Sequence, residues 1–386
     1  MISKGIIEKF FDAAFIQRWN DHVRPVELTE LDKQAHKMLI AYILAKFEET
    51  ERKQTINWTD LIQGAMFEFL HRVILTDIKP SVFHQIMKKK GNELNQWVFQ
   101  KLQPDTIDLK NNFFNNLKKY FSESNSQKLE KKILQAAHYL ATNWEFNLLY
   151  PHSSFMYSIE NTKEEIENEI EQHYDLIGVQ KLFLKKKTYR FVNFCGQLRF
   201  QQRWAHSPHL PKTSVLGHML IVAMMSYLFA IEIESTNKRI FNTFFGGLFH
   251  DLPEILTRDI ISPIKSSVEG LKDIIKEYED ILLEDKIMPL LPYSWHKEIK
   301  SFINMKDFNN SEIQKNFNKS EFLPVDAEIL IACDHLAAFI EASLSYRHGI
   351  TSRHLEDARR SIYKDYQKKE LAGINIQQIY DYFKVD

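Results

Sequence analysis

The sequence predicts an all-α protein built from two tandem helical domains. Apolar residues recur at three- and four-residue spacings through most of the 386 residues, whereas the alternation typical of β-strands is rare. Only 11 Gly and 11 Pro are present, fewer than a turn-rich β-sandwich or a glycine-rich dinucleotide fold needs. At about 150 residues per domain, the length corresponds to two or three domains.

Charge, cysteine usage and hydropathy exclude several classes of protein. Fifty Lys and Arg against 51 Asp and Glu leave a net charge of −1, so no positive field exists to bind a nucleic-acid backbone. Cys195 and Cys333 fit no CxxC pattern, which favours a reducing compartment without disulfides. The longest apolar run, residues 219–231, is shorter than the ~18 residues that a membrane span needs. We expect a soluble, cytoplasmic protein that binds neither nucleic acid nor membrane.

The elements follow from periodicity and from turn residues. Apolar spacings predict helices that include residues 39–47 and 271–282, and the acidic stretch 160–171 is expected to be a solvated helix or connector. The polar stretch 122–127 is expected to be a loop. Helices should break where Pro or Gly clusters with polar residues, at 79–80, 91–92, 207–208, 262–263 and 349.

Two stretches of the chain repeat the same features in the same order. Each has an aromatic-rich segment ending in Gln-Arg-Trp, a Pro-containing loop and then a His at the start of an apolar helix, within residues 10–47 and 191–229. Further along, LHRVILTDIKPSV (70–82) matches FHDLPEILTRDIISPI (249–264), and ILQAAHYLA (133–141) matches ILIACDHLA (329–337). Four matching features in one order predict a tandem duplication. We expect a first domain at 1–150, a helical connector at 151–184 and a second domain at 185–386.

A candidate metal site lies in the second half, at His218, the adjacent pair His250 and Asp251, and Asp334. Imidazole and carboxylate groups are ligands that divalent metals accept at neutral pH. Because these ionisable groups lie in or beside apolar helices, burying them is costly unless something satisfies them, and a metal would satisfy all four. Any one of them alone would more often be a hydrogen-bonded core His or an N-cap Asp, so the hypothesis depends on the set.

The order H…HD…D resembles the HD-domain superfamily of metal-dependent phosphohydrolases. Its surroundings resemble the bacterial 5′-deoxyribonucleotidases of the YfbR type, which share an Arg-Trp pair fifteen residues before the first His, here Arg203-Trp204, and an HDxxExLTxD-like segment, here 250–259. The resemblance covers about residues 190–370 and extends to the first half only as a degenerate copy.

The resemblance implies a role for each matching residue. His218, His250, Asp251 and Asp334 would bind one divalent metal ion, with Mn, Co, Fe, Zn and Ni not distinguished by the ligand types. Arg203 would hold the substrate phosphate and Trp204 would contact the sugar near its 2′ position. Glu254 would act as acid or base and Asp259 would assist, although Asp259 could equally cap a turn. Glu254 shares a helix face with His250 only if the helix continues through Pro253.

The first half retains Arg18-Trp19, His36 and His71, but the partner of Asp251 is Arg72. A guanidinium in the place of a metal ligand repels a divalent cation, so we expect this half to bind no catalytic metal. It is expected to have a structural role, the alternative being a regulatory nucleotide-phosphate site at Arg18 and Arg72.

The predicted function is metal-dependent release of phosphate from (deoxy)ribonucleoside 5′-monophosphates, with a nucleotide as the small-molecule partner. An alternative keeps the metal but takes nucleoside triphosphates, cyclic nucleotides or alarmones, for which only Arg258, Lys265 and Lys212 offer extra positive charge near the motif. A third interpretation is a non-enzymatic sensor or scaffold. The protein is expected to be a monomer whose halves form an intramolecular pseudo-dimer, or a homodimer.

Overall fold

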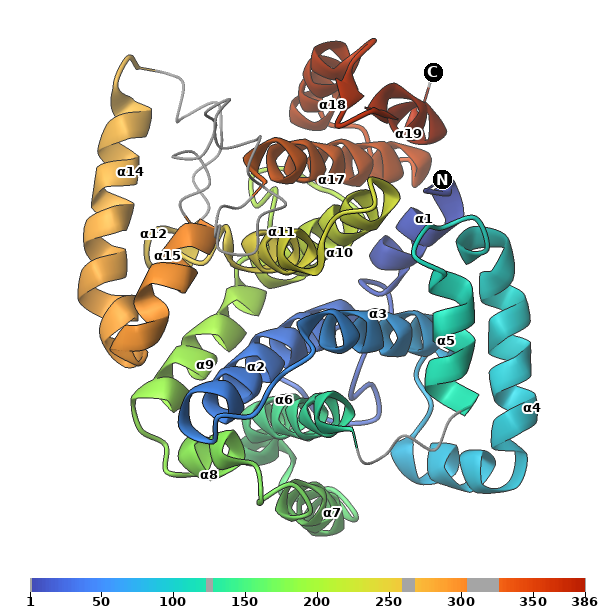
Figure 1. The fold of residues 1–386 in the computed structure, drawn as a ribbon, viewed down its shortest axis with the longest axis vertical. Helices are drawn as coiled ribbons and strands as arrows, with labels where there is room; N and C mark the ends of the chain where they lie inside the picture. The colour runs from blue at the N-terminus through green and yellow to red at the C-terminus, as the bar shows by residue number, and fades with distance from the viewer. Residues whose placement is uncertain (1, 123–127, 259–267, 304–325, 386) are drawn as a thin grey trace. The chain divides into compact units, whose positions relative to one another are not determined.

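The computed structural model describes residues 2–122, 128–258, 268–303 and 326–385. Within these ranges the regular structure is almost wholly helical, which confirms the predicted all-α class (Figure 1). The strands of the described residues are two short antiparallel segments, β1 (Glu370–Leu371) and β2 (Ile374–Asn375). The chain divides into two compact units, Met1–Gln180 and Lys181–Asp386.

The first unit is built around α6, on which two other long helices, α2 and α3, both pack. Nearly the whole of α2 is buried, and Thr29 caps its first turn by accepting a hydrogen bond from the backbone N–H of Asp32. The helices of this unit are α1 (Lys4–Asp12), α2 (Glu30–Glu51), α3 (Trp58–Leu75), α4 (Pro80–Thr106), α5 (Phe113–Ser122), α6 (Leu129–Ser153) and α7 (Ile159–Glu171), with α8 (Ile177–Phe183) at its end.

The second unit has α10, α11 and α17 at its core. Shorter helices pack against this core: α15 contacts α11, and α18 and α19 contact α17. The elements are α9 (Lys187–Gln197), η1 (Leu198–Phe200), α10 (Val215–Glu232), α11 (Asn237–Phe249), α12 (Glu254–Thr257), α14 (Leu271–Leu282), η2 (Leu283–Ile287), η3 (Met288–Leu290), η4 (Tyr293–Trp295), α15 (His296–Ile303), α17 (Ala327–Arg347), α18 (Arg353–Tyr366) and α19 (Ile376–Phe383).

Helices α10 and α11 approach each other closely at Gly247. A Cβ atom placed on Gly247 would lie 2.7 Å from Cα and 2.8 Å from the backbone nitrogen of Ala223 on α10. These are backbone atoms that cannot rotate away, so glycine is required for the two helices to pack at this distance. The close approach bears on the predicted metal site because His218 lies on α10 and His250 directly follows α11.

Helix α10 is long and apolar enough to cross a membrane by length and composition, yet 94% of that window is buried inside the protein. The flanking N-cap, Ser214, accepts a hydrogen bond from the backbone N–H of Gly217, as at the start of an ordinary core helix. The apolar run 219–231 is therefore explained by packing on α11 and α17.

Several predicted elements are confirmed and one expected break is wrong. The helices predicted at 160–171 and 271–282 are α7 and α14. The break expected at 91–92 is only a kink, because α4 continues through it with a non-helical backbone at Lys90 (φ −143°, ψ 23°). The predicted loop at 122–127 and the turn at 262–263 lie outside the described residues, except that Ser122 ends α5.

Candidate metal centre and the Arg-Trp loop

Three helices of the second unit bring His218, His250 and Asp334 together. Ligand atoms of these three residues all lie within 4.8 Å of one another, a separation that allows one metal ion to contact all of them. His218 lies in the first turn of α10, His250 follows the last residue of α11, and Asp334 lies in the second turn of α17. Since these segments are far apart in sequence, only the packing of the three helices creates the group.

The ring of His250 is oriented by the backbone of its own helix. Its Nδ1 lies 2.8 Å from the carbonyl oxygen of Gly247, so Nδ1–H donates there and Nε2 is left on the side of the ring that faces the carboxylates. Nε2 lies 3.1 Å from Oδ2 of Asp251. A backbone contact of this kind fixes both the tautomer and the direction of a metal-ligating imidazole.

His218 is fully buried and its surroundings suit a bound cation. Nε2 of His218 lies 3.0 Å from Oδ1 of Asp334 and 3.7 Å from Oδ2 of Asp251. Neither ring nitrogen of His218 makes a hydrogen bond of regular geometry with the described residues. Two carboxylates and a buried imidazole that converge in this way provide the mixed N and O donor set that divalent transition metals bind.

The charged side chains of the candidate metal centre shift one another's pKa values. Burial by itself lowers the pKa of His250, but the carboxylates of Asp251 and Asp334 outweigh it and raise the pKa of His250 to about 9. Burial opposes ionisation of Asp251 and Asp334, but the neighbouring histidines outweigh it and lower the pKa of each carboxyl. The carboxylates of Asp251 and Asp334 thus stay ionised. Their negative charge favours a cation between their oxygens and the Nε2 atoms of His218 and His250.

Asp251 and Glu254 lie at the two ends of a short turn that follows α11. Helix α11 ends at Phe249 and α12 begins at Glu254, so the single helix through Pro253 that would align Glu254 with His250 does not form. The backbone N–H of Glu254 instead donates to the carbonyl of Asp251 at 3.0 Å, and the Glu254 side chain is buried. Asp259 and Lys265 lie outside the described residues.

Arg203 and Trp204 lie on a loop, residues 201–214, that joins η1 to α10; we call it the Arg-Trp loop. Both side chains bind the same carboxylate, that of Glu341 on α17. Nε of Arg203 donates to Oε2 of Glu341 at 3.2 Å, and Nε1 of Trp204 donates to the same oxygen at 2.8 Å. The second oxygen, Oε1, accepts from the hydroxyl of Thr213 at 2.6 Å.

Sequence reasoning missed Glu341, although a signal for it was present. Glu341 follows Asp334 by seven residues, and in the first half Glu145 follows His138, the partner of Asp334, by the same interval. Both glutamates are fully buried. Because an unpaired buried carboxylate is costly, two acids at matching positions of apolar helices indicate a shared set of partners.

The first unit repeats the arrangement around this glutamate. Nε of Arg18 and Nε1 of Trp19 both donate to Oε2 of Glu145, at 2.8 and 2.9 Å. Trp19 and Trp204 adopt nearly the same left-handed backbone, with φ of 55° and 54°. An isolated β-bridge closes each loop, from Gln17 to Thr29 and from Gln202 to Ser214.

These matched positions change one sequence-based pairing. Thr29 and Ser214 are the N-caps of α2 and α10, so Lys33 in one unit and His218 in the other stand at the same distance, four residues, from the helix N-cap. His36, which the sequence pattern paired with His218, lies almost one turn further along α2 and packs edge-on against Trp144. The sequence pattern was misleading because it matched residue type instead of distance from the helix start.

Arg72 brings positive charge to the corresponding place in the first unit. Nζ of Lys33 contacts Nδ1 of His138, as His218 contacts Asp334 in the second unit. Arg72, at the position of Asp251, lies 3.6 Å from the carboxylate of Glu30. Burial and the neighbouring cations lower the pKa of Lys33, whereas arginine keeps its charge, so Arg72 opposes a divalent cation here.

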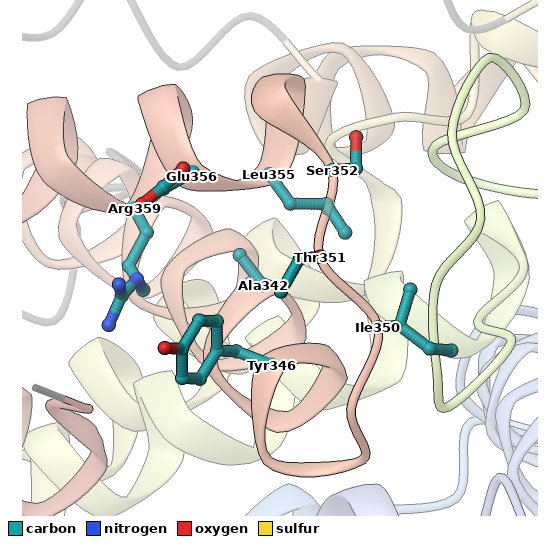
Figure 2. A pocket seen from close by; sticks show the side chains of 8 residues that line it. All are labelled: Ala342, Tyr346, Ile350, Thr351, Ser352, Leu355, Glu356 and Arg359. Carbon is teal, nitrogen blue, oxygen red and sulfur yellow. The ribbon is translucent and has the colours of Figure 1, made fainter.

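A small pocket lies between α17 and the start of α18 (Figure 2). It holds about 10 Å³, room for about one water molecule, and is too small for a nucleotide. None of the predicted site residues lines it; the lining residues are Ala342, Tyr346, Ile350, Thr351, Ser352, Leu355, Glu356 and Arg359.

Comparison with known proteins agrees with the geometry of the second unit. Residues 195–363 match a family model described as HD domain. A 5′-deoxynucleotidase of Vibrio vulnificus (strain YJ016) is 26% identical over 137 residues, which cover 32% of this chain and 65% of that protein. A 5′-deoxynucleotidase of Pasteurella multocida (strain Pm70) is 26% identical over 174 residues, which cover 42% of this chain and 77% of that protein.

The chain thus spans just under two thirds of the length of the first relative and about three quarters of the second. The matched family region contains His218, His250, Asp251 and Asp334. Over residues 195–363 the chain matches the HD-domain family model, and it resembles 5′-deoxynucleotidases of the YfbR type.

Proposed function

We propose that the second unit is a metal-dependent phosphohydrolase that releases phosphate from (deoxy)ribonucleoside 5′-monophosphates. The observation that carries the proposal is the convergence of His218, His250 and Asp334 ligand atoms within 4.8 Å, inside the segment that matches the HD domain. The names of the two relatives favour a deoxynucleotide substrate. Asp251, 3.1 Å from His250, would complete a set of four ligands.

Each residue has a role that follows from its chemistry. A divalent ion held by the four ligands would lower the pKa of a bound water and polarise the phosphoryl group. The planar guanidinium of Arg203 suits a phosphate. The indole of Trp204 beside it would contact the sugar near its 2′ position and favour deoxyribose. Glu254, buried four residues after His250, would carry the proton between water and leaving oxygen, with Asp259 assisting.

We further propose that the chain is a tandem duplication whose first unit is a degenerate HD domain. Support comes from the matched loops, the matched Arg-Trp-Glu contacts and the matched N-caps of the two units. In the first unit Arg18 is bound by two carboxylates, those of Glu30 and Glu145, which favours a structural role over phosphate binding. Buried free thiols at Cys195 and Cys333 support a reducing compartment such as the cytoplasm.

The proposal is tested by measuring phosphate release from a panel of deoxy- and ribonucleoside monophosphates with added Mn²⁺ or Co²⁺. Asp251→Asn should reduce release by more than about a hundredfold, because it removes a charged ligand. Arg72→Gln, at the matching position of the first unit, is the control and should leave release unchanged.

Other outcomes distinguish the alternatives. Release from triphosphates, cyclic nucleotides or alarmones, with none from monophosphates, would replace the proposed substrate class while retaining the metal chemistry. Metal binding without any phosphate release would favour a nucleotide sensor. A protein with neither activity nor metal affinity would be a scaffold, and the proposed function would be wrong.

A further inference from the structure

We propose that Glu341 is a positioning residue that aims Arg203 and Trp204 at the substrate, and so sets both phosphate affinity and sugar preference. The inference rests on the proposed function and extends it to a residue outside the H…HD…D pattern. The observation behind it is that the fully buried carboxylate of Glu341 accepts hydrogen bonds from both Arg203 and Trp204, the two side chains proposed to contact the substrate.

The Arg-Trp loop needs such an anchor because it has almost no regular secondary structure of its own. Apart from an isolated bridge between Gln202 and Ser214, residues 201–214 form no regular secondary structure. Trp204 has a left-handed backbone (φ 54°), which a bulky side chain adopts only when its surroundings impose it. The hydrogen bond from its indole to Glu341 is a contact that can impose it.

Helix α17 supplies both the anchor and a proposed metal ligand. Asp334 and Glu341 are seven residues apart, two helical turns, and therefore lie on the same face of α17. One turn beyond Glu341, the hydroxyl of Ser345 donates to the carbonyl of Leu210 at 2.9 Å and accepts from its N–H at 3.0 Å. The same rigid helix thus fixes the loop at two points and places Asp334, so the distance between phosphate site and ligand set is built into α17.

The charge of Glu341 matters in addition to its shape. A hydrogen bond between an ionised donor and an ionised acceptor is roughly twice as strong as a neutral one. Burial opposes ionisation of Glu341, but Arg203 and its other partners outweigh it and lower the pKa of the carboxyl. The carboxylate therefore holds the guanidinium through Nε, by charge as well as by direction.

The first unit supplies a matched control. Glu145 binds Arg18 and Trp19 in the same way, but the centre beside it holds Lys33 and Arg72 in place of two of the metal ligands. If these glutamates only stabilised their loops, equivalent substitutions in the two units would have equivalent effects. Under the positioning role, only the substitution in the second unit changes how substrate binds.

The test compares Glu341→Gln with Glu145→Gln in the full-length, metal-loaded protein. Glutamine keeps the size of the side chain, and its amide can donate to the hydroxyl of Thr213 while its oxygen still accepts from Trp204. We expect Glu341→Gln to raise KM for monophosphates by about tenfold and to lower the preference for deoxyribose, with a smaller change in kcat. Metal affinity should be unchanged, and Glu145→Gln should alter none of these quantities.

Binding of inorganic phosphate, measured by calorimetry, gives a readout that does not depend on turnover. Glu341→Gln should weaken phosphate binding by about tenfold relative to the unsubstituted protein. Equal losses of thermal stability in both variants, with KM and phosphate affinity unchanged, would show that Glu341 is only structural. Loss of metal affinity in proportion to activity would also overturn the proposal, since the effect would then act on the ligand set.

Two further outcomes are separable. If Glu341→Gln fails to fold, Glu341→Asp keeps the charge on a shorter side chain and should still raise KM and weaken phosphate binding, so unchanged values would overturn the proposal. If the unsubstituted protein hydrolyses no monophosphate, the proposed function fails, and the phosphate titration still decides the role of Glu341. Equal phosphate affinity in the unsubstituted protein and in Glu341→Gln, or no phosphate binding by either, would then overturn the positioning role of Glu341.

Discussion

Glu30 shows how a single residue of the first unit is held by charge. Its carboxylate accepts from Arg18 at 2.9 Å and from Gln34 at 2.6 Å, and it lies 3.6 Å from Arg72. Burial alone would raise the pKa of Glu30, but Arg18, Lys33 and Arg72 outweigh it and lower the pKa to about 2. The residue is therefore ionised in the folded protein across the whole neutral range.

The lowered pKa makes stability depend on pH with a definite sign. Since the folded pKa lies below the ordinary value of 4.5, Glu30 contributes stability above pH 4.5 that is lost as the pH falls toward 2. Glu30→Gln leaves buried cations without their partner and should reduce the free energy of unfolding by about 3–5 kcal/mol at pH 7. The difference between variant and original protein should shrink as the pH is lowered.

Thermal unfolding measured between pH 7 and pH 3 checks this prediction. Glu93→Gln is the control, because Glu93 pairs with Lys90 on an exposed surface and its loss should cause no measurable change. A difference between Glu30→Gln and the original protein that stayed constant over this range would contradict the assigned role of Glu30.

At the scale of elements, the packing of α10 against α11 decides the geometry of the centre. Gly247 allows the close approach and its carbonyl oxygen also orients the ring of His250. One residue thus links helix packing to ligand direction. A methyl group at this position has to push the backbone of Ala223 away, and such overpacking costs typically 1–3 kcal/mol, about what we expect here.

Gly247→Ala should therefore lower the free energy of unfolding by about 1–3 kcal/mol and also weaken metal binding, because His218 and His250 move apart. Denaturant unfolding and metal titration measure the two effects. Gly91→Ala is a suitable control, since the nearest neighbour of its Cβ is the flexible side chain of Met87 at 3.3 Å. Tight metal binding in the Gly247 variant would mean that the histidines tolerate a wider helix separation.

At the scale of the whole molecule, the two units share the contacts of an Arg-Trp pair with a buried glutamate. They differ in the side chains that stand at the candidate metal centre. The second unit combines two imidazoles with two carboxylates, whereas the first combines Lys33, Arg72, His71 and His138. With Arg72 and His138 in place of the two carboxylates, the attraction for a divalent ion is lost, and the guanidinium of Arg72 is balanced by the carboxylate of Glu30. The difference in charge predicts a difference in metal binding.

We expect one divalent metal ion per chain. Titration of the full-length protein with Mn²⁺ or Co²⁺, followed by elemental analysis after dialysis, should give a stoichiometry near one, and Asp251→Asn should lower it. Arg72→Gln should leave the value unchanged. A stoichiometry near two would show that the first unit also binds metal and would contradict the interpretation of Lys33 and Arg72.

The sequence by itself determined the helical class, because three- and four-residue periodicity is a local property that each helix displays. It also determined which residue types stand in the H…HD…D order, and with them the resemblance to HD proteins. Arg203 and Trp204 could be singled out by their spacing from His218. These features are readable because they depend on near neighbours in the chain.

Only the tertiary structure decided which residues share a contact. It replaced His36 by Lys33 as the counterpart of His218, since the helix N-cap and not the residue type sets the position. It also separated Glu254 from α11 and joined Arg203 and Trp204 to Glu341. The physical reason is the same in each case: a buried charge is satisfied by partners that helix packing brings near, at sequence separations that no local pattern records.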